Sequence, residues 1–323
     1  MDYRILGRTG VKVSPLCFGT MSFGDIADAA ESARMFHRCR ERGINFFDCA
    51  NVYAGGRSEE ILGGLIADCR DDIVLTTKVV SKAGSDINAG GASRRHIQLA
   101  VEDSLRRLQT DRIDVYFLHH YDADTPIDEM LRALDDLVRH GKILYPAVSN
   151  WAAWQVMKAQ GIAAQAGYAR IECLQPMYNL VKRQAEVEIL PMAQQEQIGV
   201  IPYSPLGGGL LTGKYRHENK PQTGRLIENQ MYIKRYGQAD YHQTAADFAA
   251  HAAERGIAPA TLAVAWVLAH PGVTAPIIGA RNLEQLEDSL AALDVAVTAE
   301  CYADISALSP SPPPAHDRLE EVR

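Results

Sequence analysis

The stretch that decides the fold spans residues 73–120, in which IVLTTK (73–78), RRHIQLAVEDSLRRL (94–108) and IDVYFLHH (113–120) follow one another. The first and last of these segments are short apolar runs rich in β-branched and aromatic residues, which is typical of buried strands. The segment between them has apolar residues at helical spacing. We therefore expect a strand over Ile73–Thr77, a helix over Arg94–Leu108 and a strand over Ile113–Leu118.

The same alternation of strand-like and helix-like segments continues along most of the chain. Eight short strands, most of them followed by a helix, favour an α/β fold of the (β/α)8 or TIM-barrel type over an open doubly wound sheet. No GxGxxG pattern follows an early strand, which further weakens the doubly wound alternative. The other expected strands are Pro15–Phe18, Asn45–Asp48, Leu144–Ser149, Ile171–Gln175, Val200–Tyr203 and Ala275–Ile278, and the other expected helices include Ala29–Arg42, Ile127–His140, Ala152–Ala166 and Glu186–Gln197.

Some segments depart from this alternation. Residues 4–14 contain two short alternating runs around a glycine-bearing turn and predict an N-terminal β-hairpin. Residues 216–241 are polar and without periodicity, so we expect a long loop over a site there. Pro146 removes a hydrogen-bond donor from the fifth strand and predicts a local irregularity. No change in composition marks a second domain, so we expect one barrel domain over residues 1–308 and an extended, proline-rich tail over 309–323.

Composition and charge argue against several classes of protein. The chain has 323 residues, 47% of them hydrophobic and 23% charged, as in ordinary globular proteins. Its net charge of −7 and pI near 5.8 argue against nucleic-acid binding, which normally needs a basic face. We find no apolar run of about 18 residues that predicts a membrane span, and the first residues lack the pattern of a signal peptide. Six cysteines without CxxC spacing fit reduced, packed thiols and a cytoplasmic location.

Four side chains of different chemical types fall near the ends of successive expected strands. Asp48 ends the second strand and Tyr53 lies in the loop that follows, while Lys78 comes after the third strand and His119 after the fourth. In a (β/α)8 barrel these positions share one rim, where the chemistry of such folds takes place. Each residue alone has an ordinary explanation, such as a helix cap, a packed ring or a solvated charge. Their coincidence on one rim predicts an active site.

The four groups complement one another chemically. A phenol has an unperturbed pKa of about 10, and a nearby ammonium favours its ionised form, so we expect Lys78 to lower the pKa of Tyr53 and suit it to act as a general acid. Asp48 is expected to keep Lys78 charged and oriented. His119 is expected to hydrogen-bond a substrate carbonyl oxygen or to relay a proton. None of the four can donate a hydride, so a nicotinamide cofactor is implied.

An ordered series of motifs resembles the aldo-keto reductase family over almost the whole chain. The motifs are LGRTG (6–10), FGTM (18–21), DCANVY (48–53), GRSE (56–59), TTK (76–78), DVYFLH (114–119), VSN (148–150), QPMYN (175–179), YSPLGGGLLTGK (203–214) and IGARNLEQL (278–286). The resemblance implies an NAD(P)H-dependent barrel enzyme whose catalytic tetrad is Asp48, Tyr53, Lys78 and His119. The family histidine directly follows a D-x-Y-x-L stretch, which selects His119. His120 is then expected near the substrate, beside Tyr53 and His119.

The resemblance also assigns residues to the cofactor. Ser149, Asn150 and Gln175 resemble residues that hydrogen-bond the carboxamide, and Tyr203 resembles the aromatic residue that stacks on the nicotinamide. The expected pyrophosphate cradle is Ser204, Pro205, Leu206, Gly209, Leu211 and Lys214, with Arg225 closing over it. The adenosine end is expected at Gly279, Arg281, Gln285, Asp288 and Ser289, with Arg281 on the 2′-phosphate. The first-strand residues Gly19, Thr20 and Met21, together with Asp48, are expected to border the same cofactor.

One departure from the family pattern affects the choice of cofactor. Family members commonly have Glu-Asn where this chain has Asp288 and Ser289, so we expect NADPH or NADP⁺ while use of NADH stays open. The expected reaction is reduction of an aldehyde or ketone, or oxidation of the corresponding alcohol, on a small-molecule substrate. The rim loops specify neither the substrate nor the physiological direction, and the oligomeric state cannot be read from the sequence.

Two alternatives accompany this interpretation. The first is a regulatory or sensor subunit of the same fold that binds the cofactor with slow or no turnover. The intact tetrad counts against loss of chemistry. The second is a metal-dependent barrel hydrolase, suggested by the adjacent His119 and His120. Such sites usually need further histidine or carboxylate ligands on other strands, and Asp48 is the nearest candidate here.

Overall fold

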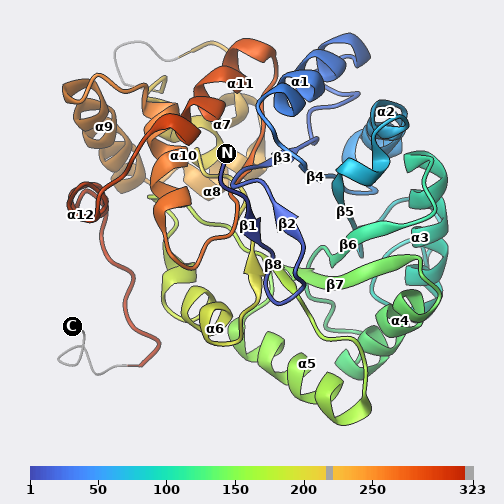
Figure 1. The fold of residues 1–323 in the computed structure, drawn as a ribbon. Coiled ribbons are helices and arrows are strands. Elements are labelled where there is room, and N and C mark those ends of the chain that lie inside the picture. Colours follow the sequence, from blue (N-terminus) through green and yellow to red (C-terminus); the bar gives the residue numbers. More distant parts are fainter. Residues whose placement is uncertain (216–220, 317–323) are drawn as a thin grey trace.

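A (β/α)8 barrel makes up the body of the protein in a computed structural model that describes residues 1–215 and 221–316 (Figure 1). Its eight parallel strands hydrogen-bond side by side in the order β10-β3-β4-β5-β6-β7-β8-β9. The Thr274 N–H donates to the Val200 carbonyl and the Ile277 N–H donates to the Pro202 carbonyl, both at 2.8 Å. These hydrogen bonds join the β9 edge of the sheet to the β10 edge and so close the barrel. The strands are β3 (Cys17–Gly19), β4 (Phe46–Asp48), β5 (Val74–Val79), β6 (Ile113–Leu118), β7 (Ile143–Ser149), β8 (Cys173–Gln175), β9 (Gly199–Val200) and β10 (Ile277–Ile278). The predicted barrel is confirmed.

The predicted hairpin is also present, as β1 (Arg4–Ile5) and β2 (Lys12–Val13), and lies across the strands in Figure 1. Its Leu6 and Val13 are fully buried in one cluster with strand residues such as Phe46 and Phe117. The contact is tight, because a Cβ on Gly199 would lie 2.5 Å from the Leu6 side chain. The hairpin therefore closes the amino-terminal end of the barrel and leaves the carboxyl ends of the strands for a site.

The helices surround the strands (Figure 1), and several of them begin at a capping side chain. Asp28, Ser93, Asn282 and Thr298 each accept a hydrogen bond from a backbone N–H in the first helical turn, which satisfies donors that a helix start leaves free. Apart from two short helices described below, the helices are α1 (Ala29–Glu41), α2 (Arg57–Ile66), α3 (Arg94–Leu108), α4 (Ile127–Arg139), α5 (Ala153–Ala166), α6 (Ile189–Gln195), α9 (Ala239–Glu254), α10 (Pro259–Ala269), α11 (Leu283–Leu290) and α12 (Ala299–Ala307).

The expected long loop over residues 216–241 is wrong from Arg225 onward. Residues 216–220 lie outside the described part, but α7 (Arg225–Glu228) and α8 (Gln230–Tyr236) follow, and α9 begins at Ala239. Tyr232 and Tyr236 of α8 are buried four residues apart, so tertiary packing of two aromatic rings stabilises a helix that local composition does not predict.

The expected irregularity at Pro146 is also absent. β7 runs through Pro146 without a break, with Tyr116 paired to Pro146 and Phe117 to Ala147. The Pro146 carbonyl accepts the Glu172 N–H at 3.0 Å, just before β8 begins. The missing donor therefore interrupts neither neighbouring ladder.

The C-terminal segment is partly described. Residues 309–316 form neither helix nor strand, as the proline-rich composition predicts, and residues 317–323 lie outside the described part. The start of the segment is held by Arg183, whose Nη1 donates to the carbonyls of Ser306 and Ser309 at 2.8 and 3.3 Å.

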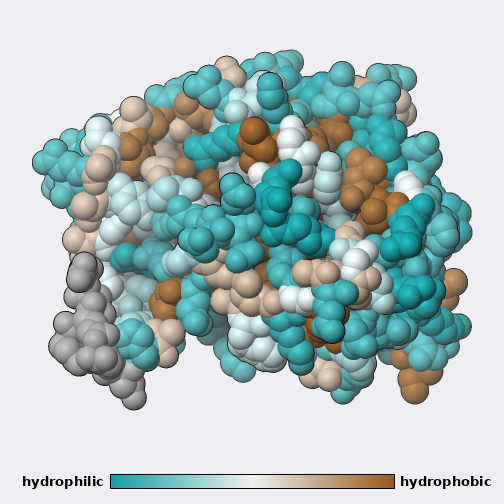
Figure 2. Space-filling view, turned by 60° about the horizontal axis from the view of Figure 1, so that its bottom comes forward, coloured by the Kyte–Doolittle hydropathy of each residue, from teal (hydrophilic) through white to brown (hydrophobic). Residues whose placement is uncertain are grey.

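The surface turned forward in Figure 2 is mostly hydrophilic, with apolar side chains in separate patches. Larger exposed apolar residues include Trp154 and Met157 on α5. Within residues 1–215 and 221–316, no helix is both long and apolar enough to cross a membrane.

Candidate active site

A cavity of about 580 Å³ opens at the carboxyl ends of the strands and brings together most of the predicted site residues. The tetrad members Asp48, Tyr53 and His119 line it. The predicted cofactor residues that line it are Gly19, Met21, Ser149, Asn150, Gln175, Tyr203, Ser204, Pro205, Leu206, Gly209, Lys214, Arg225, Gly279, Arg281, Gln285, Asp288 and Ser289.

Four predicted residues do not line the cavity, namely Lys78, described below, and Thr20, Leu211 and His120. Thr20 is buried beneath it, where its N–H and hydroxyl donate to the Asp48 carbonyl at 2.9 and 3.1 Å, so it supports the backbone of the tetrad aspartate. Leu211 is fully buried in the hydrophobic core. His120 is exposed at the rim, with Nδ1 3.1 Å from the Tyr121 carbonyl oxygen.

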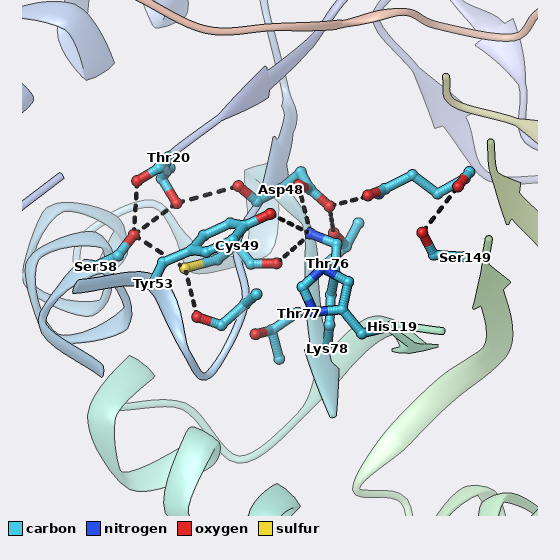
Figure 3. Close-up of polar contacts among 12 residues, drawn as sticks. Thr20, Asp48, Cys49, Tyr53, Ser58, Thr76, Thr77, Lys78, His119 and Ser149 are labelled. Carbon is cyan, nitrogen blue, oxygen red and sulfur yellow. Dashed lines mark hydrogen bonds and ion pairs between the residues drawn. The ribbon is translucent and has the colours of Figure 1, made fainter. Parts of the chain in front are cut away.

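Lys78 lies inside β5 rather than after it, and is fully buried directly below the cavity. Its Nζ donates to Asp48 Oδ2 at 2.6 Å, to the Cys49 carbonyl at 2.6 Å and to the Tyr53 hydroxyl at 3.4 Å (Figure 3). Burial, the largest single effect, lowers the pKa of Lys78, but the charge of Asp48, the charge of Tyr53 and the hydrogen bond to Asp48 together outweigh it, so the pKa is raised. The ammonium therefore stays charged, with Tyr53 and Asp48 directed at it.

Asp48 is held on both carboxylate oxygens. While Oδ2 faces Lys78, Oδ1 accepts the Thr76 hydroxyl at 2.7 Å and the Gln175 Nε2 at 2.9 Å. The backbone carbonyl of Gln175 in turn accepts a hydrogen bond from the Ser149 hydroxyl at 2.8 Å. The predicted role of Asp48 in orienting Lys78 therefore has a geometric basis, and Gln175 helps to fix the carboxylate.

Tyr53 reaches the site from η1 (Tyr53–Gly56), a sharp turn between β4 and α2. Gly55 and Gly56 have φ values of 65° and 98°, and a Cβ on Gly56 would lie 2.9 Å from the Arg107 side chain. Both positions favour glycine. The sequence AGG directly after the tyrosine, in which Ala54 also has a positive φ of 50°, thus turns the chain so that the phenol points back over Lys78.

Lys78 acts to lower the pKa of Tyr53, as expected, but the net shift of that pKa is upward. Burial raises the pKa of Tyr53 to about 12, although the charge of Lys78 opposes the rise. The sequence shows the ammonium beside the phenol but not the desolvation of both groups. Because the phenol is protonated at neutral pH, it is ready to donate a proton.

His119 is neutral in this environment. Burial and then the charge of Lys78 lower its pKa to about 3. The imidazole lies edge-on to the Tyr53 ring, with centroids 6.2 Å apart, and its Nδ1 is 3.4 Å from the Ser81 hydroxyl. A neutral imidazole beside the phenol can hydrogen-bond a carbonyl oxygen without placing a second cation next to Lys78.

An ion pair between a partly exposed arginine and a buried carboxylate supports the tetrad from behind. Glu59, on α2, is fully buried and accepts the Thr77 hydroxyl at 2.6 Å and the Arg107 Nε at 2.7 Å. Thr77 precedes Lys78 in β5, and Arg107 also packs against Gly56 in the turn that carries Tyr53. The pair therefore ties the strand of the lysine to the loop of the tyrosine.

Removing Arg107 is expected to destabilise the fold, because it leaves the Glu59 carboxylate buried without its cation. We expect Arg107→Met to lower the free energy of unfolding by about 3 kcal/mol, measured by urea denaturation. Arg106→Met is the matched control, since Arg106 projects into solvent with 72% of its side chain exposed and should change stability by less than about 0.5 kcal/mol. Equal stability of the two variants would contradict this role for Arg107.

The nicotinamide end predicted from the sequence is preorganised. The Tyr203 hydroxyl donates to Asn150 Oδ1 at 2.7 Å, and Asn150 Nδ2 donates to the His119 carbonyl at 3.0 Å. Asn150 and Ser204 have positive φ values of 57° and 60°, which non-glycine residues seldom adopt. The hydrogen bonds thus connect Tyr203, through Asn150, to the tetrad histidine.

Next to Tyr203, η4 (Gly207–Thr212) wraps the cavity wall with three consecutive glycines in the left-handed region. A Cβ on Gly208 would lie 2.7 Å from the Tyr232 ring, and one on Gly209 would lie 3.2 Å from the Lys214 side chain. The glycines therefore let α8 and Lys214 approach the cavity. Sequence reasoning included Gly209 but missed Gly208.

We expect Gly208→Ala to displace α8, because its new Cβ would overlap the Tyr232 ring. The free energy of unfolding should fall by about 1–3 kcal/mol more than in Gly141→Ala, and affinity for NADPH, the cofactor expected from the sequence, should fall with it. Gly141 is a matched control because its φ of 71° is similar while nothing lies within 4 Å of its Cβ position. Urea denaturation and a fluorescence titration with NADPH measure both effects. Identical stabilities and affinities for the two variants would contradict the expected overlap.

Several cavity residues were missed by the sequence reasoning. The helix α8 contributes Met231, Tyr232 and Arg235, all within the segment predicted as a loop. The pair of tyrosines at helical spacing was the available signal. The remaining missed residues are Gly208, Thr212, Ala258, Pro259, Ala260, Ile277, Ile278 and Ala280.

The sequence model of the aldo/keto reductase family matches residues 15–310 of this chain. The chain belongs to the aldo/keto reductase family. A Bacillus subtilis protein named uncharacterized oxidoreductase YrpG is 39% identical, and the match covers 97% of each chain. A probable voltage-gated potassium channel subunit beta of Oryza sativa is 37% identical, covering 97% of this chain and 98% of the relative. Norsolorinic acid reductase B of Dothistroma septosporum is 35% identical, covering 96% and 82%.

Family membership makes this chain an aldo/keto reductase-type oxidoreductase by descent, and sets aside the barrel hydrolase suggested by His119 and His120. In the part of the chain that the structure describes, no group of three or more His, Cys, Asp or Glu side chains is arranged to hold a metal ion.

Proposed function

We propose that this aldo/keto reductase reduces an aldehyde or ketone to the alcohol with NADPH, reversibly, with Tyr53 as the general acid. The observation that carries the proposal is the contact of Lys78 Nζ with both Asp48 Oδ2, at 2.6 Å, and the Tyr53 hydroxyl, at 3.4 Å, at the floor of the cavity. A protonated phenol, a buried cation and a neutral imidazole converge there, which suits proton donation to a carbonyl oxygen.

The residues around the cavity fit a phosphate-bearing dinucleotide. Lys214, Arg225 and Arg281 supply positive charge, and the glycines of η4 let the backbone approach a ligand closely. Arg281 precedes α11, whose N-cap Asn282 orders the first turn; a guanidinium there suits a ribose phosphate. NADPH is therefore the proposed cofactor, and when bound it supplies the hydride.

The side chains of this protein then have distinct tasks. Tyr203 presents its ring at the nicotinamide end, fixed by its hydrogen bond to Asn150. His119, neutral at physiological pH, orients the substrate carbonyl by a hydrogen bond to its oxygen. Tyr53 gives its hydroxyl proton to that oxygen as negative charge develops, and the charge of Lys78 stabilises the resulting tyrosinate.

The reaction direction should depend on pH through Tyr53. Reduction uses the protonated phenol, which prevails below its pKa of about 12, whereas alcohol oxidation uses the tyrosinate. Raising the pH should therefore favour oxidation. The six cysteines are free thiols, and we propose the cytoplasm as the location on that basis.

A single-turnover experiment tests the proposal. Purified protein loaded with one equivalent of NADPH is mixed rapidly with an aldehyde, and loss of the reduced-nicotinamide absorbance is followed. We expect one equivalent to be oxidised in step with alcohol formation. Retention of reduced NADPH in the presence of aldehydes, ketones and sugars would contradict carbonyl reduction.

The second candidate is a cofactor-binding regulatory subunit, favoured by relatives from Oryza sativa, Arabidopsis thaliana and Schizosaccharomyces pombe that are named voltage-gated potassium channel subunit beta. The assembled tetrad supports catalysis over this alternative. Tight NADPH binding without single-turnover oxidation would favour the regulatory candidate instead.

A further inference from the structure

The cavity holds more positive charge than its own carboxylates balance. Two carboxylates line it, and one of them, Asp48, is already paired with Lys78. Among residues 1–215 and 221–316, no carboxylate forms an ion pair with any of the four cations that line it. These cations are Lys214, Arg225, Arg235 and Arg281. A chain of net charge −7 thus has a cationic cavity, which indicates anionic ligands.

Three of these cations act on one another. Burial, then the charges of Arg281 and Arg225, lower the pKa of Lys214. The three groups therefore share one region, next to Gly209, whose Cβ position is 3.2 Å from the Lys214 side chain. This region is the one proposed above for the phosphates of the cofactor.

Arg235 lines the same cavity and shares the Tyr232 ring with Arg225, the two guanidinium groups lying 5.5 and 5.3 Å from the ring centroid. Burial raises the pKa of Tyr203 to about 12, and the charge of Arg235 opposes this rise while Tyr53 adds to it. Arg235 is therefore within electrostatic reach of the ring next to the tetrad. Tyr203 is linked through Asn150 to His119, and Arg235 lines the same cavity as Tyr53 and His119.

The helix that carries Arg235 is fixed in place. Its guanidinium lies 5.5 Å from the centroid of the Tyr232 ring, and that ring packs over Gly208. One turn further, the Tyr236 hydroxyl accepts Asn179 Nδ2 at 3.2 Å. Arg235 is thus half-buried on a packed helix, and its charge is positioned before any ligand binds.

We propose that Arg235 binds the substrate and selects carbonyl compounds that carry a carboxylate. The inference rests on the proposed carbonyl reduction. A guanidinium presents a planar pair of donors that match the two oxygens of a carboxylate. An aldehyde or ketone acid would place its carboxylate on Arg235 and its carbonyl oxygen beside Tyr53 and His119.

A matched pair of substrates tests the selection. We expect the protein to have a higher kcat/KM for para-carboxybenzaldehyde than for its neutral methyl ester. In Arg235→Met the ratio of the two kcat/KM values should fall about tenfold, as expected for loss of a hydrogen-bonded charge. The ratio for Arg235→Lys should lie between those of the original protein and Arg235→Met. Lys234→Met is the matched control: it removes the same charge from the adjacent exposed residue, which does not line the cavity, and should keep the ratio.

Binding measurements separate this inference from the proposed function. Para-hydroxymethylbenzoate is titrated by calorimetry into each variant saturated with NADP⁺, and NADPH affinity is measured by fluorescence. We expect Arg235→Met to weaken the carboxylate about tenfold and the cofactor much less. An equal effect on acid and ester, or a loss mainly in NADPH affinity, would overturn the role of Arg235. Reduction of neither aldehyde would contradict the proposed function alone, because the titration still decides whether Arg235 binds the carboxylate.

Discussion

Replacing Tyr53 by Phe is expected to lower kcat for carbonyl reduction by at least about a hundredfold, the contribution typical of a general acid, while NADPH still binds. The change removes only the hydroxyl that lies 3.4 Å from Lys78 Nζ and keeps the ring that packs near His119. Steady-state kinetics with an aldehyde and a fluorescence titration with NADPH measure the two effects separately.

The control for this variant is Tyr145→Phe. It removes the same atom from a tyrosine whose hydroxyl donates to the Thr9 carbonyl in the N-terminal hairpin, away from the cavity, so kcat should keep its original value. Equal losses of NADPH affinity and turnover in Tyr53→Phe would contradict the role of Tyr53 as a proton donor.

The second large effect is expected for Lys78→Met, in both stability and activity. Removing the ammonium leaves the buried Asp48 carboxylate without its cation, so the free energy of unfolding should fall by about 3–5 kcal/mol. Turnover should be lost as well, because the charge that stabilises the Tyr53 anion is gone. Alcohol oxidation by any residual activity should need a higher pH than in the original protein, since Lys78 lowers the pKa of Tyr53.

A double variant distinguishes these two roles of Lys78. In Asp48→Asn/Lys78→Met both charges are absent, and the amide can still hydrogen-bond Thr76 and Gln175. Stability measured by urea denaturation should therefore recover in part, whereas turnover should not. A double variant as unstable as the single one, or a single variant with full activity, would contradict the assigned ion pair.

The stability from Lys78 also has a defined pH range. Its folded-state pKa is raised above the ordinary 10.5, so the contribution is fully present below about pH 10.5 and is lost as the pH rises through the folded-state value. Acidification should leave this contribution of the lysine unchanged.

The barrel and the tetrad were predictable because both depend on short-range pattern. Alternating strand and helix segments predict the architecture, and the fold itself brings the ends of successive strands to one rim. Asp48, Tyr53 and His119 could therefore be assigned to one cavity from their positions near the ends of successive strands, whereas Lys78, expected after its strand, lies within it.

The remaining errors come from effects that need three dimensions. The helix α8 forms because Tyr232 packs over Gly208 and Tyr236 bonds to Asn179, partners that lie far away in the sequence. Because this segment was predicted as a loop, Arg235 was not recognised as a cavity residue. The predicted direction of the Tyr53 pKa shift was wrong, because burial raises the pKa by more than the charge of Lys78 lowers it. Pro146 is tolerated because β8 begins beyond the missing donor.

The most direct test of carbonyl reduction is to follow the hydride itself. The protein is incubated with an aldehyde and NADPH that is dideuterated at the reactive carbon of the nicotinamide, and the alcohol is analysed by mass spectrometry. We predict one deuterium on the former carbonyl carbon in each alcohol molecule, and none formed by Tyr53→Phe above the background without protein. Alcohol without deuterium, or no alcohol from protein that binds NADPH, would contradict the account.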